Sequence, residues 1–423
     1  MKRVVNYIFL LMLAVLVLNI GTVSAESLPF HGFVESSIGG RYDSPDYIND
    51  DLLLYETRAQ LSYWGALGYN GEFQVKADII KDNITDQADI KLREGYIWAY
   101  PSANFEIKAG RQVLTWGTGD LIFINDLFPK EYQSFFLGRD QEYLKAPSDA
   151  IKFSFFPQGG AIVDVVWTPS FTADNYLKGE RLTFFDPGQG GNIEANLENP
   201  QFSAKLPEKD WENGELALRV KKNYQGNELA FYAYKGFYKE PNANQAGNGL
   251  EFAPLNVYGA SWRNNVMGGV ANLELGYYDS ADDQAGDKWN IPNSSIKALL
   301  GYSRDLGNDF SVGVQYNLEH MEDYDAYISS LGANYPYLSE ENNEQITLRL
   351  TKLFNKQTIR TDLFTFYSLS DKDAYLRPQF SYDWTDNINF SAGANIFLGE
   401  QDYTFFGQLE DNSNLYMRMR YSY

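Results

Sequence analysis

Histidine is the side chain that most readily carries a proton near neutral pH, and this chain has two, His31 and His320. A hydrolase at a membrane interface pairs a histidine with a serine nucleophile and a group that orients the ring. Glu319 and Glu322 lie close to His320 in the sequence, but no motif marks a serine partner. The sequence therefore predicts an ordinary histidine at the end of a strand, and no enzyme activity.

Two acidic runs could bind calcium through carboxylate oxygens. One contains Asp282, Asp283 and Asp287, and the other spans 43–51. Neither has the spacing of a defined calcium loop, so solvated acidic loops are expected and no metal site is predicted. The sequence also has no phosphate-binding loop, no dinucleotide fingerprint and no basic patch for nucleic acid. We therefore expect no cofactor and no nucleic-acid partner.

The basic residues follow a two-residue repeat. In the closing stretch 414–423, Arg418 and Arg420 alternate with Met417, Met419 and Tyr421. Such alternation is typical of a strand with one apolar and one polar face. The same pattern recurs in about 18 segments of roughly 10 to 13 residues, a length typical of tilted membrane-spanning strands. The segments are 30–42, 51–64, 70–81, 89–101, 104–114, 149–157, 160–168, 214–223, 227–238, 255–265, 268–279, 295–305, 309–320, 344–353, 357–368, 374–384, 388–398 and 414–423.

These segments predict an all-β fold, an antiparallel transmembrane β-barrel of 18 strands, with 16 as the alternative. They are about twice as long as ordinary globular strands, and many end on Tyr or Trp, as membrane interfaces favour. Short turns alternate with longer, mostly acidic loops, which we assign to the periplasmic and extracellular sides. The region 169–213 is irregular, and 201–206 within it could be one more strand, so a count of 20 also stays open.

The first 25 residues have the features of a signal peptide. Lys2 and Arg3 precede an apolar run over 7–20, and 23–25 is a small-residue cleavage signal. Residues 26–423 would then form one barrel domain. The whole chain has a net charge of −21, and removing Lys2 and Arg3 with the signal peptide leaves −23. The chain has no cysteine. No later stretch reaches the ~20 apolar residues of a membrane helix. We expect an exported protein in the outer membrane, held together without disulfides.

One stretch is more distinctive than the rest, GRQVLTWGTGDLIFINDLFP at 110–129. It resembles a segment of porin-like bacterial outer-membrane β-barrel proteins often encoded beside RND-type exporters and related in architecture to alginate-export channels. The stretch 376–386 and the closing YSY are similar to that family's last strands. The resemblance implies an outer-membrane channel of 18 or 16 strands. The chain is short for that group and region 169–213 departs from it, so no substrate is carried over.

The long segment 115–148 is rich in aromatic residues and charges, so we do not expect it to lie wholly in water. One hypothesis is that it folds into the barrel and constricts the pore, because long loops without their own secondary structure are usually functional. The alternative is that it packs over the mouth or against a neighbouring subunit. The residues that we assign to the constriction are Trp116, Asp120, Asn125, Asp126 and Arg139.

The alternation also predicts which charges face the interior. The predicted pore-lining residues are Arg58, Lys76, Arg93, Lys108, Arg111, Arg219, Lys221, Arg349, Arg360, Arg377, Arg418 and Arg420. Of these, Arg111 is assigned through the constriction hypothesis and not by alternation. Inward acids such as Glu56, Asp164 and Glu274 make the lumen mixed, with a modest basic excess. Rings of side chains govern selectivity, so the excess favours anionic or polyhydroxylated solutes. The alternative is that opposed charges pair only to stiffen the wall.

Three functions remain open. The first is a channel for small-molecule solutes, the second is the exit component of an export system with an exporter as partner, and the third is a non-transport barrel. That barrel would be an adhesin or a sheath around a periplasmic electron carrier. The other expected partners are outer-membrane lipid, surface glycolipid and the barrel-assembly machinery, which would read Met419, Tyr421 and Tyr423 as an insertion signal. The solute, direction of flux, gating and oligomeric state are not predicted.

Overall fold

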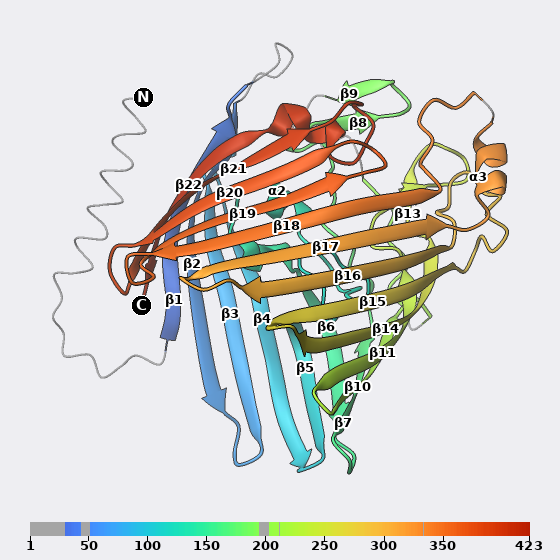
Figure 1. The fold of residues 1–423 in the computed structure, drawn as a ribbon. Coiled ribbons are helices and arrows are strands. Elements are labelled where there is room, and N and C mark those ends of the chain that lie inside the picture. The colour runs from blue at the N-terminus through green and yellow to red at the C-terminus, as the bar shows by residue number, and fades with distance from the viewer. Residues whose placement is uncertain (1–29, 44–50, 194–202, 211, 333) are drawn as a thin grey trace.

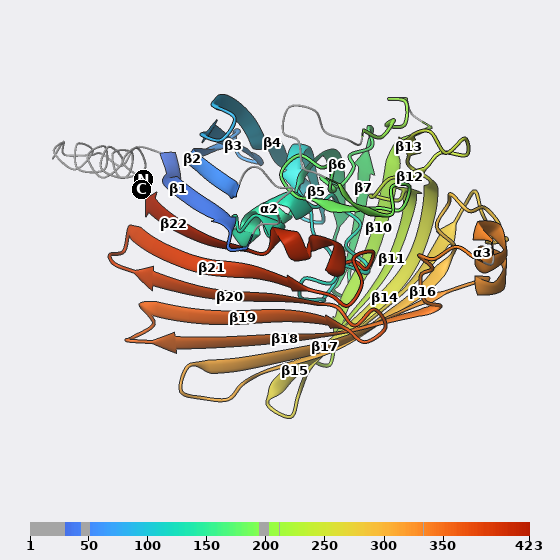
Figure 2. The same ribbon diagram turned by 90° about the horizontal axis from the view of Figure 1, so that it is seen from above.

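The chain forms one large antiparallel sheet that closes on itself (Figures 1 and 2). The computed structural model describes residues 30–43, 51–193, 203–210, 212–332 and 334–423, so the predicted signal peptide 1–25 lies outside the described residues. The eighteen strands of the sheet are β1 (Phe30–Arg41), β2 (Leu52–Ala66), β3 (Gly71–Asp82), β4 (Gln87–Ser102), β5 (Phe105–Val113), β6 (Pro147–Phe155), β7 (Ala161–Thr168), β10 (Glu215–Tyr224), β11 (Asn227–Phe237), β14 (Pro254–Val266), β15 (Gly269–Ser280), β16 (Ser295–Asp305), β17 (Phe310–Met321), β18 (Asn342–Phe354), β19 (Ile359–Ser368), β20 (Ala374–Asp383), β21 (Ile388–Leu398) and β22 (Asn414–Ser422).

Each strand pairs with the next along the chain, and the last pairs with the first. On β22, Met419 lies opposite Ser36 of β1 and Tyr421 lies opposite Val34, which closes the barrel. The prediction of 18 strands is confirmed, and the alternatives of 16 and 20 are wrong. β7 pairs directly with β10, so no strand comes between them. Of the segment 201–206, the first two residues lie outside the described residues and Ala204 makes an isolated bridge to Leu250.

Short connections and long ones alternate between the two ends of the barrel (Figure 1). The long ones carry the small elements β8 (Phe184–Asp186), β9 (Gly191–Ile193), β12 (Asn242–Ala243), β13 (Leu250–Glu251), α3 (Tyr324–Leu331) and η2 (Gly407–Asn412). Within the described residues, no helix is long and apolar enough to span a membrane.

The distribution of apolar side chains is inverted relative to that of a water-soluble domain. Large apolar groups are exposed on the outer face, among them Ile90, Met417 and Phe231 with 71%, 66% and 64% of their surface accessible. The buried apolar residues lie inside the barrel. The period of two in the sequence explains the arrangement, because alternate side chains of a strand point to opposite faces.

The barrel interior is crossed by residues 114–146, which connect β5 to β6 and which we call the inner segment. It contains α2 (Tyr132–Phe136) and the 3-10 turn η1 (Gln141–Leu144), and Figure 2 shows α2 enclosed by the strands. Two apolar clusters form between the inner segment and the inner wall, one around Phe136 and one around Trp116. The core of this protein is therefore mainly the contact between the wall and the inner segment, with Leu182, Phe406 and Leu409 added from other loops.

Candidate functional site

The first half of the inner segment is held by one carboxylate of the wall. Glu274 on β15 has 1% of its surface exposed and accepts hydrogen bonds from the backbone N–H of Gly119 at 2.7 Å and from Asn125 Nδ2 at 3.0 Å. It also accepts from the backbone N–H of Thr118. A buried carboxylate requires such partners, because leaving a buried charge without hydrogen bonds is costly. Glu274 thus fixes the path of the segment over residues 118–125.

Glycines on the inner faces of β14 and β15 make room for this contact. A Cβ at Gly259 would lie 1.8 Å from Asn125 Oδ1, and a Cβ at Gly276 would lie 2.7 Å from Ile124. Any larger residue at Gly259 would overlap the amide of Asn125. The inner segment and the wall are therefore matched in shape at this point.

Two ion pairs attach the inner segment to distant parts of the wall. Asp120 pairs with Arg349 on β18, whose Nη2 lies 2.9 Å from Asp120 Oδ1. Further along, Arg139 pairs with Glu56 on β2 at 2.8 Å. Since β2 and β18 are separated by several strands in both directions around the sheet, the segment spans the interior.

Asp126 contacts mainly the inner segment itself, whereas Trp116 also packs against the wall. Asp126 is buried, pairs with Lys130 at 3.2 Å and accepts a hydrogen bond from Thr115 Oγ1 at 2.8 Å. Trp116 packs edge-on against Phe128 with 5.1 Å between ring centroids, and the guanidinium of Arg219 lies 5.2 Å from its ring. Asp126 therefore holds the fold of the segment, whereas Asp120, Asn125 and Arg139, together with Trp116, attach it to the wall.

An aromatic stack anchors α2. Phe136 packs edge-on against Tyr375 of β20 and Phe397 of β21, with centroid distances of 5.7 Å and 5.5 Å. Neither of these two wall residues has any exposed surface. Asn395 and Asn414 donate hydrogen bonds to the backbone oxygen of Phe136. The anchor therefore combines apolar contact with satisfied backbone polar groups.

Most of the predicted pore-lining cations form ion pairs inside the barrel. The pairs are Arg58 with Glu56 and Asp78, Lys76 with Glu94, Arg219 with Asp164, Lys221 with Glu228, Arg349 with Asp120, Arg360 with Asp362, and both Arg418 and Arg420 with Glu35 and Asp140. In the described part of the chain, Arg93, Lys108 and Arg377 have no carboxylate within ion-pair distance. These three instead contact backbone oxygens or aromatic rings, as Lys108 does with Tyr96.

Arg111 lies on the other face of the wall. It is opposite Gly95 of β4, an odd number of residues from the inward Lys108, and β5 pairs with β6 without a shift of register. Its guanidinium forms a two-pronged contact with Asp149 of β6, at 2.8 Å and 2.7 Å, and both side chains are exposed. The alternation of the strand therefore separates Arg111 from the other cations of the predicted set.

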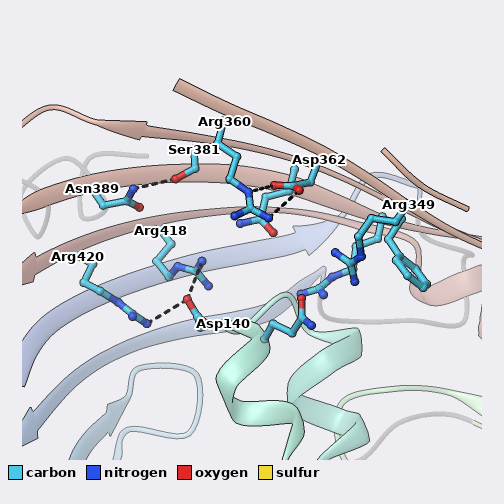
Figure 3. Close-up of a pocket in the computed structure, with 12 residues that line it drawn as sticks. Asp140, Arg349, Arg360, Asp362, Ser381, Asn389, Arg418 and Arg420 are labelled. Carbon is cyan, nitrogen blue, oxygen red and sulfur yellow. Dashed lines mark hydrogen bonds and ion pairs between the residues drawn. The ribbon is translucent and has the colours of Figure 1, made fainter. Parts of the chain in front are cut away.

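Arginines gather in one pocket of about 410 Å³ on the inner wall (Figure 3). Its lining contains five guanidinium groups and two carboxylates. Arg349 also pairs with Asp120, and Arg418 and Arg420 also pair with Glu35, and these two carboxylates lie outside the lining. The charged lining residues are Arg349, Arg360, Arg377, Arg418, Arg420, Asp140 and Asp362. Gln379, Ser381 and Asn389 add hydrogen-bonding groups. Strands β18, β19, β20 and β22 supply the arginines, and the inner segment supplies Asp140 (Figure 3).

The carboxyl group of Asp140 is kept ionised by its neighbours. Burial acts to raise its pKa, but the guanidiniums of Arg418 and Arg420, at 3.2 Å and 3.3 Å, outweigh burial and lower the pKa below its ordinary value. The nearby Glu142 behaves differently, because burial raises its pKa despite the proximity of Arg420. The inner segment thus contributes one ionised carboxylate, that of Asp140, to a pocket lined by arginines.

The remaining candidate residues provide no second site. Among the described residues, no group of three or more histidine, cysteine or acidic side chains could hold a metal ion. His320 contacts Asn342 Oδ1 through Nδ1 at 2.9 Å. Of the residues that organise the interior, Glu56 and Glu274 are on the inward face by alternation, but Asp140 and Gly259 carry no local signal in the sequence. Their importance comes from contacts between distant parts of the chain.

The comparisons with known proteins support the fold. No family model and no curated protein matches the chain. Among solved structures it is similar to OccD3 (OpdP) of Pseudomonas aeruginosa, with a TM-score of 0.56 and 11% identity over 94% of this chain and 92% of that one. A mutant porin of Rhodopseudomonas blastica has a TM-score of 0.41 and 11% identity over 93% of this chain and 99% of that one. The outer-membrane protein OmpT of Vibrio cholerae, in trimer form, has a TM-score of 0.41 and 9% identity over 93% of this chain and 98% of that one. The first likeness supports the barrel, and the lower scores add nothing to it.

Proposed function

We propose that the chain is an outer-membrane channel that passes small solutes and prefers anionic or polyhydroxylated ones. A closed barrel satisfies its backbone hydrogen bonds without an edge, and its exposed apolar exterior suits a bilayer. The fold shared with OccD3 is consistent with this location. The aromatic end of β22, with Met419, Tyr421 and Tyr423, is proposed as the signal read by the assembly machinery.

The pocket in Figure 3 is the observation that carries the anion preference. Ion pairing alone would stiffen the wall, and the pairs of Arg58 or Arg219 fit that interpretation. The pocket differs because the cations of its lining outnumber the carboxylates of its lining, and because Arg377 forms no ion pair among the described residues. Arg377 contacts the backbone oxygen of Arg139 and the ring of Phe135. Guanidinium groups bind carboxylate and phosphate in planar, two-pronged geometry, so such a pocket favours solutes that carry these groups.

The inner segment is proposed as the constriction of this channel. It attaches to β2, β15, β18 and β21, and it supplies Asp120, Asp140 and Arg139 to the space that remains. This arrangement disfavours the sheath, which would need a wide and mostly uncharged bore. The role of an exit component for an exporter is kept as the alternative on the resemblance at 110–129.

Reconstitution of the purified protein into planar bilayers tests the proposal. We expect single-channel currents in KCl, and a reversal potential in a salt gradient whose sign reports chloride as the more permeant ion. Small dicarboxylates and phosphorylated sugars should reduce the chloride current by competing for the arginine pocket. Clear cation selectivity would contradict the anion preference, and the absence of any current would contradict the channel.

A further inference from the structure

The wall of the barrel is incomplete between β4 and β5. The strand β5 pairs with β4 at residues 95–99, and it then ends at Val113, where the chain enters the barrel as the inner segment. The upper part of β4, residues 87–94, continues beyond this point and pairs with β3 alone. Over the described residues, this stretch is a strand edge inside an otherwise continuous sheet. Arg111 partly covers it, since Nη1 donates to the backbone oxygen of Leu92 at 3.4 Å.

The open edge lies at the level of the apolar exterior. On the outer face of β3 and β4, Val75 and Ile97 are exposed below the point where β4 and β5 part, with 43% and 53% of their surface accessible. Ile79, Ile90 and Leu92 continue the apolar face alongside the open edge, with 44%, 71% and 42% accessible. The strand edge therefore does not project above the apolar band into the loops.

A strand edge at this level poses a physical problem. Each backbone group left unsatisfied in hydrocarbon costs several kcal/mol, and irregular backbone at membrane depth is tolerated where it lines a water-filled cavity. A cavity with a volume of about 640 Å³ is present here, and residues 89–93 of β4 line it. Its size is within the ~300–1,000 Å³ of small-ligand sites.

The cavity reaches through the wall. Ile90, Leu92 and Arg111 line it from the outer face, whereas Arg58 and Tyr143 line it from the inside. Its charged lining is balanced, with six cations and six carboxylates: Arg58, Lys91, Arg93, Arg111, Arg139 and Arg181 against Glu56, Asp78, Asp82, Asp89, Glu131 and Glu180. A site with apolar groups at one end and balanced charges at the other fits a ligand that has an apolar chain at one end and a head group with both charges at the other.

We propose that this opening is a side portal, through which a single-chain amphiphile with a zwitterionic head passes between the barrel interior and the outer leaflet. The chain would lie along Ile90 and Leu92. The head would lie among the paired charges, where Arg93 is the lining cation that forms no ion pair with a described residue. Its guanidinium donates to the backbone oxygens of Glu142 and Lys145 and lies 4.5 Å from the ring of Tyr143. The portal goes beyond the proposed small-solute pathway and needs only that the barrel spans the membrane.

The first test asks whether the edge is wet at lipid depth. The chain has no cysteine, so a single fluorophore can be placed at Leu92→Cys or, as the matched control, at Val75→Cys on the fully paired β3. In liposomes, brominated lipid should quench both fluorophores. Aqueous iodide should quench the fluorophore at Leu92→Cys severalfold more strongly than the one at Val75→Cys. Equal and weak iodide quenching at the two positions would overturn the portal.

The second test asks whether the cavity binds the amphiphile. A fluorophore at Lys91→Cys, in the cavity, is titrated with dodecylphosphocholine below its critical micelle concentration. A saturable signal is expected, with Arg93→Gln weakening the apparent affinity severalfold. The control is Lys108→Cys, on the inner face of β5 below the opening. The same response at both positions, or no saturation at Lys91→Cys, would overturn the proposal. The KCl current is recorded on the same samples, so a failure of the channel is told apart from a failure of the portal.

Discussion

Asp120 of the inner segment and Arg349 of β18 form an ion pair across the interior of the barrel, between residues that lie 229 positions apart in the sequence. Asp120 is the one carboxylate that lies within ion-pair distance of Arg349 among the described residues. Arg349 also lines the arginine pocket. This single contact therefore couples the position of the inner segment to the charge that a solute would meet.

The variant Asp120→Asn should raise the preference for anions. It removes the negative charge that balances Arg349, and an uncompensated guanidinium in the pocket attracts anions more strongly. The chloride-to-potassium permeability ratio, measured from reversal potentials in a KCl gradient, should increase. Asp386→Asn is the control, because it removes the same charge from an exposed turn between β20 and β21. A ratio that falls, or that rises equally in the control, would contradict the coupling.

Removing a cation from the pocket should have the opposite effect. The variant Arg360→Gln deletes one of five guanidinium groups and leaves Asp362, its partner on the same strand, without a cation at 2.5 Å. The chloride preference should fall. Arg111→Gln is a close control, because it removes an arginine of comparable exposure from the outer face of the wall. If the two variants shift the reversal potential alike, the pocket does not set the selectivity.

Loosening the inner segment should widen the channel. Deleting residues 120–140 would also remove Phe135 and Phe136 from the core, so a single substitution is cleaner. The carboxylate of Glu274 accepts hydrogen bonds from N–H groups of the inner segment. In Glu274→Gln, the amide NH₂ group cannot accept them, and a buried hydrogen bond to a charged group contributes ~1.5–3 kcal/mol to stability. Single-channel conductance should increase. Glu228→Gln, at a partly exposed ion pair with Lys221, should leave the conductance unchanged.

The aromatic anchor of α2 should account for much of the stability. The variant Phe136→Ala removes a ring that contacts Tyr375 and Phe397, and such truncations in a packed core cost about 3–5 kcal/mol. Thermal unfolding in detergent micelles should occur at a clearly lower temperature. Phe155→Ala removes a ring that is 46% exposed on the outer face, and it should change the unfolding temperature much less. Equal losses in both variants would show that the anchor is not distinctive.

The strands could be predicted from the sequence because each carries its own periodic signal. Alternation of apolar and polar residues is local, so β17 and β18 are recognisable without knowledge of their neighbours, and their predicted bounds differ from the observed ones by one or two residues. The inward position of Arg418 and Arg420 follows from the same alternation. The assignment of Arg111 to the interior shows the limit of the approach, because it was placed with the distinctive stretch at 110–129 and not by counting along β5.

The interior arrangement could not be predicted, because it depends on contacts between distant residues. Nothing in the sequence around Glu274 indicates that its carboxylate accepts hydrogen bonds from the N–H groups of residues 118 and 119. Nothing in the sequence around Gly259 indicates that Asn125 occupies the space beside it. The open edge of β4 was hidden for the same reason. Its residues alternate like those of any barrel strand, and the missing partner results from the early end of β5.

Asp174 makes the attachment of the inner segment sensitive to pH. Its Oδ1 accepts a hydrogen bond from the backbone N–H of Lys130 at 2.7 Å, and its own N–H donates to the backbone oxygen of Lys239 at 3.0 Å. Burial is the largest influence and raises the pKa of Asp174 to about 7, with Glu240 acting in the same direction and Lys130 and Lys239 opposing it. The unfolded chain has the ordinary value of about 3.9. The folded state therefore binds the proton more tightly than the unfolded state, and its stability decreases as the pH rises from about 4 through about 7.

The unfolding temperature in micelles should accordingly decrease between pH 5 and pH 8, and Asp174→Asn should flatten this dependence. Asparagine keeps an oxygen that can accept the hydrogen bond from Lys130 but carries no charge at any pH. The unfolding temperature of the variant should therefore rise relative to that of the wild type as the pH increases. Asp287→Asn, which removes a carboxylate from an exposed loop, should retain the wild-type slope. If Asp174→Asn retained that slope as well, the pH dependence would have to come from other carboxyl groups, and the attachment at Lys130 would be independent of the proton.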